Sequence, residues 1–286
     1  MKRFLAVLLS VLMILSMAAC GTKAQSAASA SGSATASGSA TASAPAKLPM
    51  EGMHLKMAGY AGFYPFRYTD TDGKIKGVDI DIYNEFAKRL GFTWEFVDVP
   101  FAEVVAGVST GLYDMAGSMS YTAERDKSVD FSKYPYYYPR LAVLCKKGAG
   151  LKSVKDLETK KVCVALGTSE ADWVAKNVKC AKLEQLEGAA TYTSIISGYN
   201  DAYISDSVEL ANVAKENNLE SNILPYDETK EILTPYRFLF KDKYEYRDLF
   251  DQTLQDMYKD GTLNKIITSW LGDACAMKDD QFVEGF

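Results

Sequence analysis

The alternation of apolar and polar residues predicts short strands and helices through the first half of the folded chain. A helix is expected from Asp79, as its N-terminal cap, to Leu90, because apolar residues recur there every four positions and Gly91 follows. The other elements expected here are strands at 55–59, 93–97 and 140–145 and a short helix at 101–111. Strands that alternate with helices are typical of a parallel sheet with helical crossovers, so an α/β fold is predicted.

A second unit with the same rhythm follows. Its expected elements are strands at 162–166 and 202–204, helices at 189–198 and 207–217, and a helix that starts after Gly167 and passes through Trp173 and Val174. The chain then returns through a strand at 236–240 and an amphipathic helix at 246–259. Two extended crossings, near 140–146 and 232–240, suggest a hinged pair of lobes with a ligand between them, although spacing alone does not prove that the chain crosses twice.

The first 47 residues differ in kind from the rest. Lys2 and Arg3 precede an uncharged apolar run over 4–19, which is the pattern of a secretory signal peptide and is short for a spanning helix. Residues 21–47 are almost entirely Ala, Ser, Gly and Thr. Such a segment cannot bury enough apolar surface to fold, so it is expected to be a flexible tether of roughly 30 Å root-mean-square span.

Composition excludes several classes of function. A net charge of −5 and a pI of about 5.2 argue against binding of nucleic acid. His54 is the only histidine and no two cysteines form a C-x-x-C pair, so neither a metal site nor a cofactor is expected. A secreted protein permits disulfides, and Cys163 with Cys180 is the favoured pair because both are expected on strands of one lobe, although spacing does not settle it.

One polar run carries candidate binding chemistry. Ser118, Ser120 and Thr122 alternate, so in an extended segment their hydroxyls lie on one side, and Arg125 follows three residues later. A guanidinium fork with neutral donors suits a free carboxylate. The alternative is a polar loop in which Arg125 pairs with a neighbouring acid in solvent.

This run resembles the S-x-S-x-T-x-x-R signature of the family 3 solute-binding proteins, which capture polar amino acids for ABC importers. Further segments that resemble the family in its order, over about residues 55–272, are Tyr64–Tyr68, Asp72–Lys74, Gly77–Ile82, Gly167–Ser169, Asp201–Asp206 and Tyr258–Trp270. The resemblance implies a two-lobed periplasmic-binding-protein (type II) fold with a hinge of two crossing strands. The implied boundaries are 48–143 and 238–286 for lobe one and 144–237 for lobe two.

The resemblance extends to the N-terminus. Ser16 to Gly21 looks like a bacterial lipobox, with Met17 where Leu is usual. This implies a signal peptide over 1–19, cleavage before Cys20 and a lipid on its thiol, followed by a linker to residue 47. Cleavage without lipidation is the alternative. The implied location is the extracytoplasmic face of the cell membrane.

The resemblance also implies roles for individual residues. Arg125 and Ser120 would take the α-carboxylate with help from Ser169, and Asp206 would take the α-ammonium. Ser118 would accept from the ammonium or hold Ser120 in place. Three of these candidates have a structural alternative: Ser169 and Asp206 could cap the helices that follow them, and Thr122 could cap the turn that carries Arg125 rather than touch a ligand.

Around the ligand's side chain, Phe63 and Phe101 align with positions where the family packs an aromatic or apolar group. Tyr60 replaces the acid that members binding lysine, arginine or histidine place there, which argues against a basic ligand. Taken without this alignment, an aromatic cluster such as Tyr60, Phe63, Tyr64 and Phe66 is more often core than pocket.

The function expected is therefore a monomeric, lipid-anchored receptor that passes an amino acid to an ABC importer permease, without catalysis. One alternative is an enzyme similar to cyclohexadienyl (prephenate or arogenate) dehydratase, which shares the fold and would need Glu170 as its general acid. A sensory domain of a membrane kinase is the other, and it would need a membrane span beyond Phe286.

Overall fold

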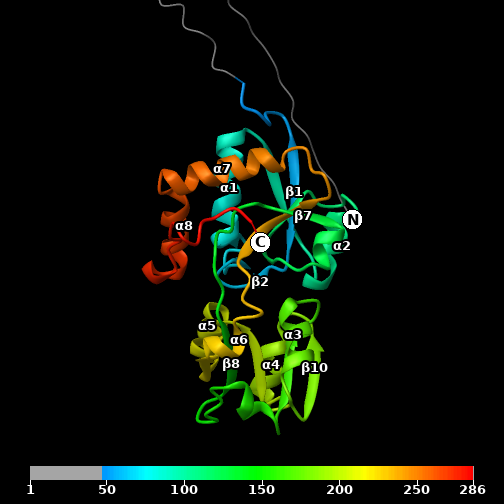
Figure 1. Ribbon diagram of the computed structural model, residues 1–286, viewed down its shortest axis with the longest axis vertical. Helices are drawn as coiled ribbons and strands as arrows, with labels where there is room; N and C mark the ends of the chain where they lie inside the picture. Colours follow the sequence, from blue (N-terminus) through cyan, green and yellow to red (C-terminus); the bar gives the residue numbers. More distant parts are fainter. Residues whose placement is uncertain (1–46, 286) are drawn as a thin grey trace, which may run out of the picture. The chain divides into compact units, whose positions relative to one another are not determined.

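The computed structural model describes residues 47–285, which form one compact unit (Figure 1). The predicted signal peptide, Cys20 and nearly all of the tether lie outside these residues. The described part is an α/β structure with two five-stranded sheets, one in each of two lobes, and the predicted fold class is confirmed. Within residues 47–285, no helix combines the length and apolar character needed to cross a membrane.

Lobe one is built on the sheet β5-β1-β6-β13-β7, in which β13 is antiparallel to its neighbours. Its strands are β1 (His54–Gly59), β5 (Thr93–Asp98), β6 (Met115–Ser120), β7 (Val129–Phe131) and β13 (Tyr236–Lys241). Helices α1 (Val78–Leu90), α7 (Arg247–Lys259) and α8 (Thr262–Leu271) cover one side, and α2 (Phe101–Ser109) covers the other (Figure 1). A small sheet of β2 (Gly62–Phe63), β3 (Arg67–Thr69) and β4 (Ile75–Lys76) and the short helices η1 (Arg125–Lys127) and η3 (Asp273–Cys275) complete the lobe.

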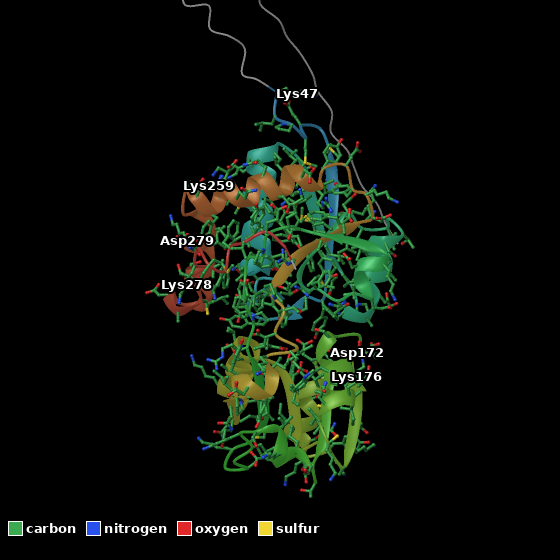
Figure 2. The ribbon with its side chains drawn as sticks, viewed as in Figure 1. Lys47, Asp172, Lys176, Lys259, Lys278 and Asp279 are labelled. Atoms are coloured by element: carbon green, nitrogen blue, oxygen red, sulfur yellow. The ribbon has the colours of Figure 1, made fainter. Side chains whose placement is uncertain are left out.

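Lobe two is built on the sheet β10-β9-β11-β8-β12, with β8 antiparallel to both of its neighbours. The strands are β8 (Leu141–Lys146), β9 (Lys161–Ala165), β10 (Lys182–Leu186), β11 (Ala202–Asp206) and β12 (Leu219–Ile223). The helices are η2 (Val154–Leu157), α3 (Ser169–Asn177), α4 (Ala190–Ser197), α5 (Ser207–Asn217) and α6 (Tyr226–Thr229). Asp172 and Lys176 mark α3 in Figure 2.

The chain passes between the two sheets twice, through adjacent segments. Tyr137 and Tyr236 form a bridge between these segments, and the Tyr236 amide donates to the Tyr137 carbonyl at 2.7 Å. Strand β8 pairs only within the second sheet and β13 only within the first. The predicted boundaries after residues 143 and 237 therefore fall inside these two strands, and the sheets divide the chain a few residues earlier.

The four described cysteines are free thiols, so the favoured Cys163–Cys180 disulfide is not present. The alternation along β9 gives the physical reason. Cys163 points to the sheet face covered by α4, where its Sγ lies 3.5 Å from the Ser194 hydroxyl. Cys180 precedes β10 instead of lying on a strand, and it packs with Val162 and Val164 on the opposite face.

Candidate functional site

A cavity of about 410 Å³ lies between the two lobes and is lined by both. From lobe one the lining residues are Tyr60, Phe63, Arg67, Asp98, Val99, Pro100, Phe101, Ala102, Ser118, Ser120, Arg125 and Tyr236. From lobe two they are Ala165, Leu166, Thr168, Ser169, Glu170, Leu186, Glu187, Gly188, Ala189, Tyr203, Ser205 and Glu209. This volume falls within the range of roughly 300–1,000 Å³ that is usual for small-molecule sites.

The lobes touch beside this cavity. The Arg125 Nη2 of lobe one donates to the Gly167 carbonyl of lobe two at 3.0 Å. Gly167 has a φ of +78°, and a Cβ there would lie 2.8 Å from the Ala102 Cα across the cleft. Glycine at this position therefore serves both the backbone conformation of the turn and the close approach of the lobes.

Arg125 projects from η1 into the cavity without a carboxylate partner. Its Nη1 donates to the Ser120 carbonyl at 2.9 Å, and its guanidinium lies 5.8 Å from the centre of the Phe101 ring. Burial lowers its pKa from a very high ordinary value, and the negative charge of Glu170 opposes that shift. Among the described residues no acid lies within ion-pair distance of it, so this cation is available to a ligand anion.

The prediction that the hydroxyls of Ser118, Ser120 and Thr122 lie on one side of an extended segment is wrong. Ser118 has a φ of +51°, which turns its side chain away from the pattern, and its hydroxyl donates to the buried Asp79 carboxylate at 2.9 Å. Thr122 follows the end of β6 and does not line the cavity; its Oγ1 accepts from the Arg125 amide at 3.2 Å. The structure therefore favours the capping alternative for Thr122, while Ser118 and Ser120 line the cavity.

A buried ion pair lies at the wall of the cavity, with Arg67 lining the cavity and Asp79 behind it, and the sequence reasoning missed it. Arg67 Nη1 contacts Asp79 Oδ2 at 2.7 Å, and both side chains are almost fully buried. A Cβ on Gly59 would collide with the Arg67 side chain, and one on Gly117 would lie 2.8 Å from the Asp79 carboxylate, so both glycines make room for the pair.

Asp79 is consequently not the N-terminal cap of α1, as was predicted. Gly77 occupies that position without a side-chain cap. Burial raises the Asp79 pKa, and the charge of Arg67 together with hydrogen bonds from the Tyr136 and Ser118 hydroxyls opposes the rise. An arginine set between Phe66 and Tyr68 was the available sequence signal, because a charge in an apolar run needs a buried partner.

Asp206 caps α5, as the alternative reading allowed. Its Oδ1 accepts from the Val208 amide at 2.8 Å, and the Tyr137 hydroxyl lies 3.3 Å from Oδ2. Burial raises the Asp206 pKa to about 7, and the nearby charge of Glu170 adds to the rise. The side chain is buried and is not among those lining the cavity, although the preceding residue, Ser205, does line it.

Ser169 does not cap α3, because Thr168 holds that position and accepts from the Ala171 amide at 3.2 Å. Ser169 is the first residue of the helix and lines the cavity, where its hydroxyl donates to Glu170 Oε2 at 3.2 Å. Tyr60, Phe63 and Phe101 line the cavity as well, although Phe63 also stacks on Phe66 of the core with ring centres 4.9 Å apart.

Glu209 is a cavity residue that the sequence gave no reason to select. It lies in the first turn of α5, partly exposed to the cavity, and its Oε2 accepts from the Ser205 hydroxyl at 2.6 Å. Burial, with the charges of Asp206 and Glu170, raises its pKa to about 8. An acid in a first helical turn reads in sequence as a favourable helix-dipole residue, which hides any other role.

Comparisons with known proteins show which family this chain resembles. The family model for bacterial extracellular solute-binding proteins, family 3, matches residues 55–273. The L-cystine-binding protein TcyA of Bacillus subtilis (strain 168) is 30% identical over 276 residues, covering 96% of this chain and 98% of that protein.

Solved structures of amino-acid-binding proteins are also similar to this chain. An ancestral arginine-binding protein bound to glutamine superposes with a TM-score of 0.70 at 32% identity, over 77% of this chain and 98% of that one. An ancestral amino-acid-binding protein described as a precursor of cyclohexadienyl dehydratase gives a TM-score of 0.69 at 30% identity, over 76% and 95%. The chain belongs to the bacterial extracellular solute-binding proteins of family 3.

Proposed function

We propose that this protein is the amino-acid receptor of an ABC importer, held at the outer face of the cell membrane by a lipid on Cys20. The observation that carries the proposal is the pairing of charges across the cleft. Lobe one presents Arg125 without a carboxylate partner, and lobe two presents carboxylates in and behind the opposite wall. An α-amino acid carries one charge of each sign on adjacent groups and would bridge the two lobes.

The roles follow from these positions. Arg125 and Ser120 take the α-carboxylate, with Ser169 as a further hydroxyl donor from lobe two. Asp206 accepts from the α-ammonium once a ligand draws the cavity wall inward, while Ser118 holds the Arg67–Asp79 pair behind the site. Tyr60, Phe63 and Phe101 surround the ligand's side chain.

A thermal-shift screen tests the proposal. The mature chain is heated with each of the twenty common amino acids, cystine and ornithine. Because ligand binding stabilises the folded state by about 2.7 kcal/mol at a hundredfold excess over Kd, the true ligand should raise Tm by several degrees. If no free amino acid raises Tm, the proposal is wrong.

Anchoring is tested separately. Wild-type chain expressed in a bacterium should partition into the detergent phase, and Cys20→Ser should partition into the aqueous phase with unchanged ligand binding. Both variants in the aqueous phase would argue for cleavage without lipidation.

Catalysis as a dehydratase is a second candidate, because a solved neighbour is described as a precursor of such an enzyme and burial raises the pKa of the cavity residue Glu209 to about 8. Glu209 replaces Glu170, the general acid expected from the sequence, which also lines the cavity and accepts a hydrogen bond from the Ser169 hydroxyl. A general acid in the cleft is what that reaction requires. Incubation with prephenate or arogenate should give no phenylpyruvate or phenylalanine if the protein only binds, and steady product release that Glu209→Gln abolishes would establish the enzyme.

A further inference from the structure

The cavity contains more acidic side chains than a simple amino acid requires. Its charged lining consists of two cations, Arg67 and Arg125, and four acids, Asp98, Glu170, Glu187 and Glu209. The charge of Arg67 is matched from behind by Asp79. An amino acid with a neutral side chain offers a single ammonium group, so it would leave most of these acids without a cationic partner.

Glu209 is the acid best placed to use a further cation. Within residues 47–285 the hydrogen bond found for its side chain is the one from Ser205 to Oε2, which leaves Oε1 for a ligand. Asp98 Oδ1 already accepts from the Ala61 amide at 2.8 Å, and Glu187 is exposed at the rim. Glu209, by contrast, lines the cavity together with aromatic side chains such as Tyr60 and Tyr203.

We propose that Glu209 forms a distal subsite that binds a second ammonium group, so that the ligand is an α-amino acid whose side chain ends in a protonated amine. The inference rests on the proposed function and adds the substrate class. It also replaces the expectation drawn from Tyr60, because the acid missing at position 60 in lobe one is supplied by Glu209 from lobe two. Burial raises the pKa of the Tyr60 phenol, and the nearby Tyr192 and Glu209 add to the rise.

Arg67 helps to determine whether the end of the ligand's side chain carries a carboxylate beside its amine. Its Nη1 donates to Asp79 Oδ2 and to the Gly117 carbonyl, and no hydrogen bond from its Nη2 is found in the described residues. Arg67 lines the same cavity, and its charge acts on the pKa of Glu209. A distal amine can come alone, as in lysine and ornithine, or beside a carboxylate, as in cystine and diaminopimelate; only the second kind gives Arg67 an anion to bind.

Proton release provides a readout that a merely structural Glu209 would not give. The groups that act on Glu209 are Ser205 and Asp206 from β11, Glu170 from α3 and Arg67 from β3, and together with burial they set its pKa at about 8. At pH 7 its carboxyl group is then mostly protonated, and a bound ammonium would displace that proton. Any proton that Asp206 releases on binding the α-ammonium should be the same for every α-amino acid. This contribution therefore cancels when the proton release of two ligands is compared.

The experiment is isothermal calorimetry at pH 7 in buffers of different ionisation enthalpy. The ligands are lysine, ornithine, cystine and diaminopimelate, with norleucine, glutamine and glutamate as controls. The best diamino ligand should bind roughly 10- to 100-fold more tightly than norleucine or glutamine and release more protons on binding than they do. Glu209→Gln should remove both differences, while Glu216→Gln, on the exposed side of the same helix, should change neither.

Arg67→Lys separates the two sources. It keeps the charge facing Asp79 and should weaken cystine and diaminopimelate, but not lysine, if the distal carboxylate is part of the ligand; a variant that also retains wild-type Tm gives a clean comparison. Tight binding of glutamine or norleucine with no gain from a distal amine, or diamino ligands unaffected by Glu209→Gln, overturns the inference. In that case loss of binding in Arg125→Ala would show that the receptor function still stands.

Discussion

The guanidinium of Arg125 provides the sharpest test of the site, because it is at once the candidate carboxylate partner and a contact between the lobes. Arg125→Ala removes the bonds to the Ser120 and Gly167 carbonyls at 2.9 and 3.0 Å. It also leaves any bound carboxylate without a counterion inside the cavity between the lobes.

The magnitude follows from the environment. Removal of one partner from a buried ion pair costs roughly 3–5 kcal/mol, which corresponds to two to four decades in Kd. Hydrogen bonds to two backbone carbonyls add little to binding itself, since water replaces them in the open form. Most of the loss should therefore appear as weaker affinity rather than a lower Tm of the unliganded protein.

Calorimetry with the ligand found in the screen measures this loss. Lys127→Ala is the matched control, because Lys127 is a cation on the same short helix whose partner, Glu124, lies on the surface. We expect no measurable binding for Arg125→Ala at accessible concentrations and wild-type affinity for the control. A loss of less than fivefold for Arg125→Ala would refute the carboxylate assignment.

Three further predictions concern the scaffold. Asp79→Asn should destabilise the fold by roughly 3–5 kcal/mol in chemical denaturation, because it leaves the Arg67 charge buried and unpaired, whereas Asp248→Asn, which breaks an exposed pair with Lys133, should cost less than about 1 kcal/mol. Gly167→Ala should weaken ligand binding and reduce the ligand-induced fall in radius of gyration measured by small-angle scattering, because its Cβ meets Ala102 across the cleft; Gly148→Ala, with a similar φ of +83° and open space around it, controls for backbone strain and should close normally. Burial raises the Asp251 pKa from 3.8 to about 6, so its ionisation opposes folding: the penalty is nearly absent at pH 3, grows between about pH 4 and 6, and levels off above pH 6 at about 2–3 kcal/mol. Asp251→Asn should therefore raise Tm at pH 8 and leave it nearly unchanged at pH 3, and an equal shift at both pH values would contradict this reasoning.

Hydrophobic periodicity predicted the order and type of the elements because it is a local property. The helix predicted at 207–217 is found at Ser207–Asn217, and the strand predicted at 140–145 is found at Leu141–Lys146. Each of these segments buries one face or both against its own lobe, so its pattern is readable without knowledge of the rest of the chain.

The errors arise where a distant residue decides the conformation. Ser118 leaves the strand pattern with a φ of +51°, in a position where Asp79 and Tyr136, from two other segments, accept or donate hydrogen bonds. Asp79 was read as a cap because Asp is common there, and its true partner, Arg67, lies in a different element. Such contacts leave no trace in a periodicity that spans a single strand or helix.

Glu209 illustrates a different limit. Its carboxylate belongs to the site only because α5 starts at the cleft and lobe one closes the cavity opposite it. The same closure brings Arg125 into contact with Gly167. Ligand binding at Arg125 can therefore affect the contact between the two lobes. A ligand that bridges Arg125 and the acids of lobe two has full contact only when the lobes approach, and it therefore binds the closed arrangement more tightly and shifts the population toward it by the ratio of the two affinities. Selectivity and closure are then one process: an amino acid without a group for Glu209 lacks part of the attraction that draws lobe two onto lobe one, and it should both bind more weakly and close the receptor less completely.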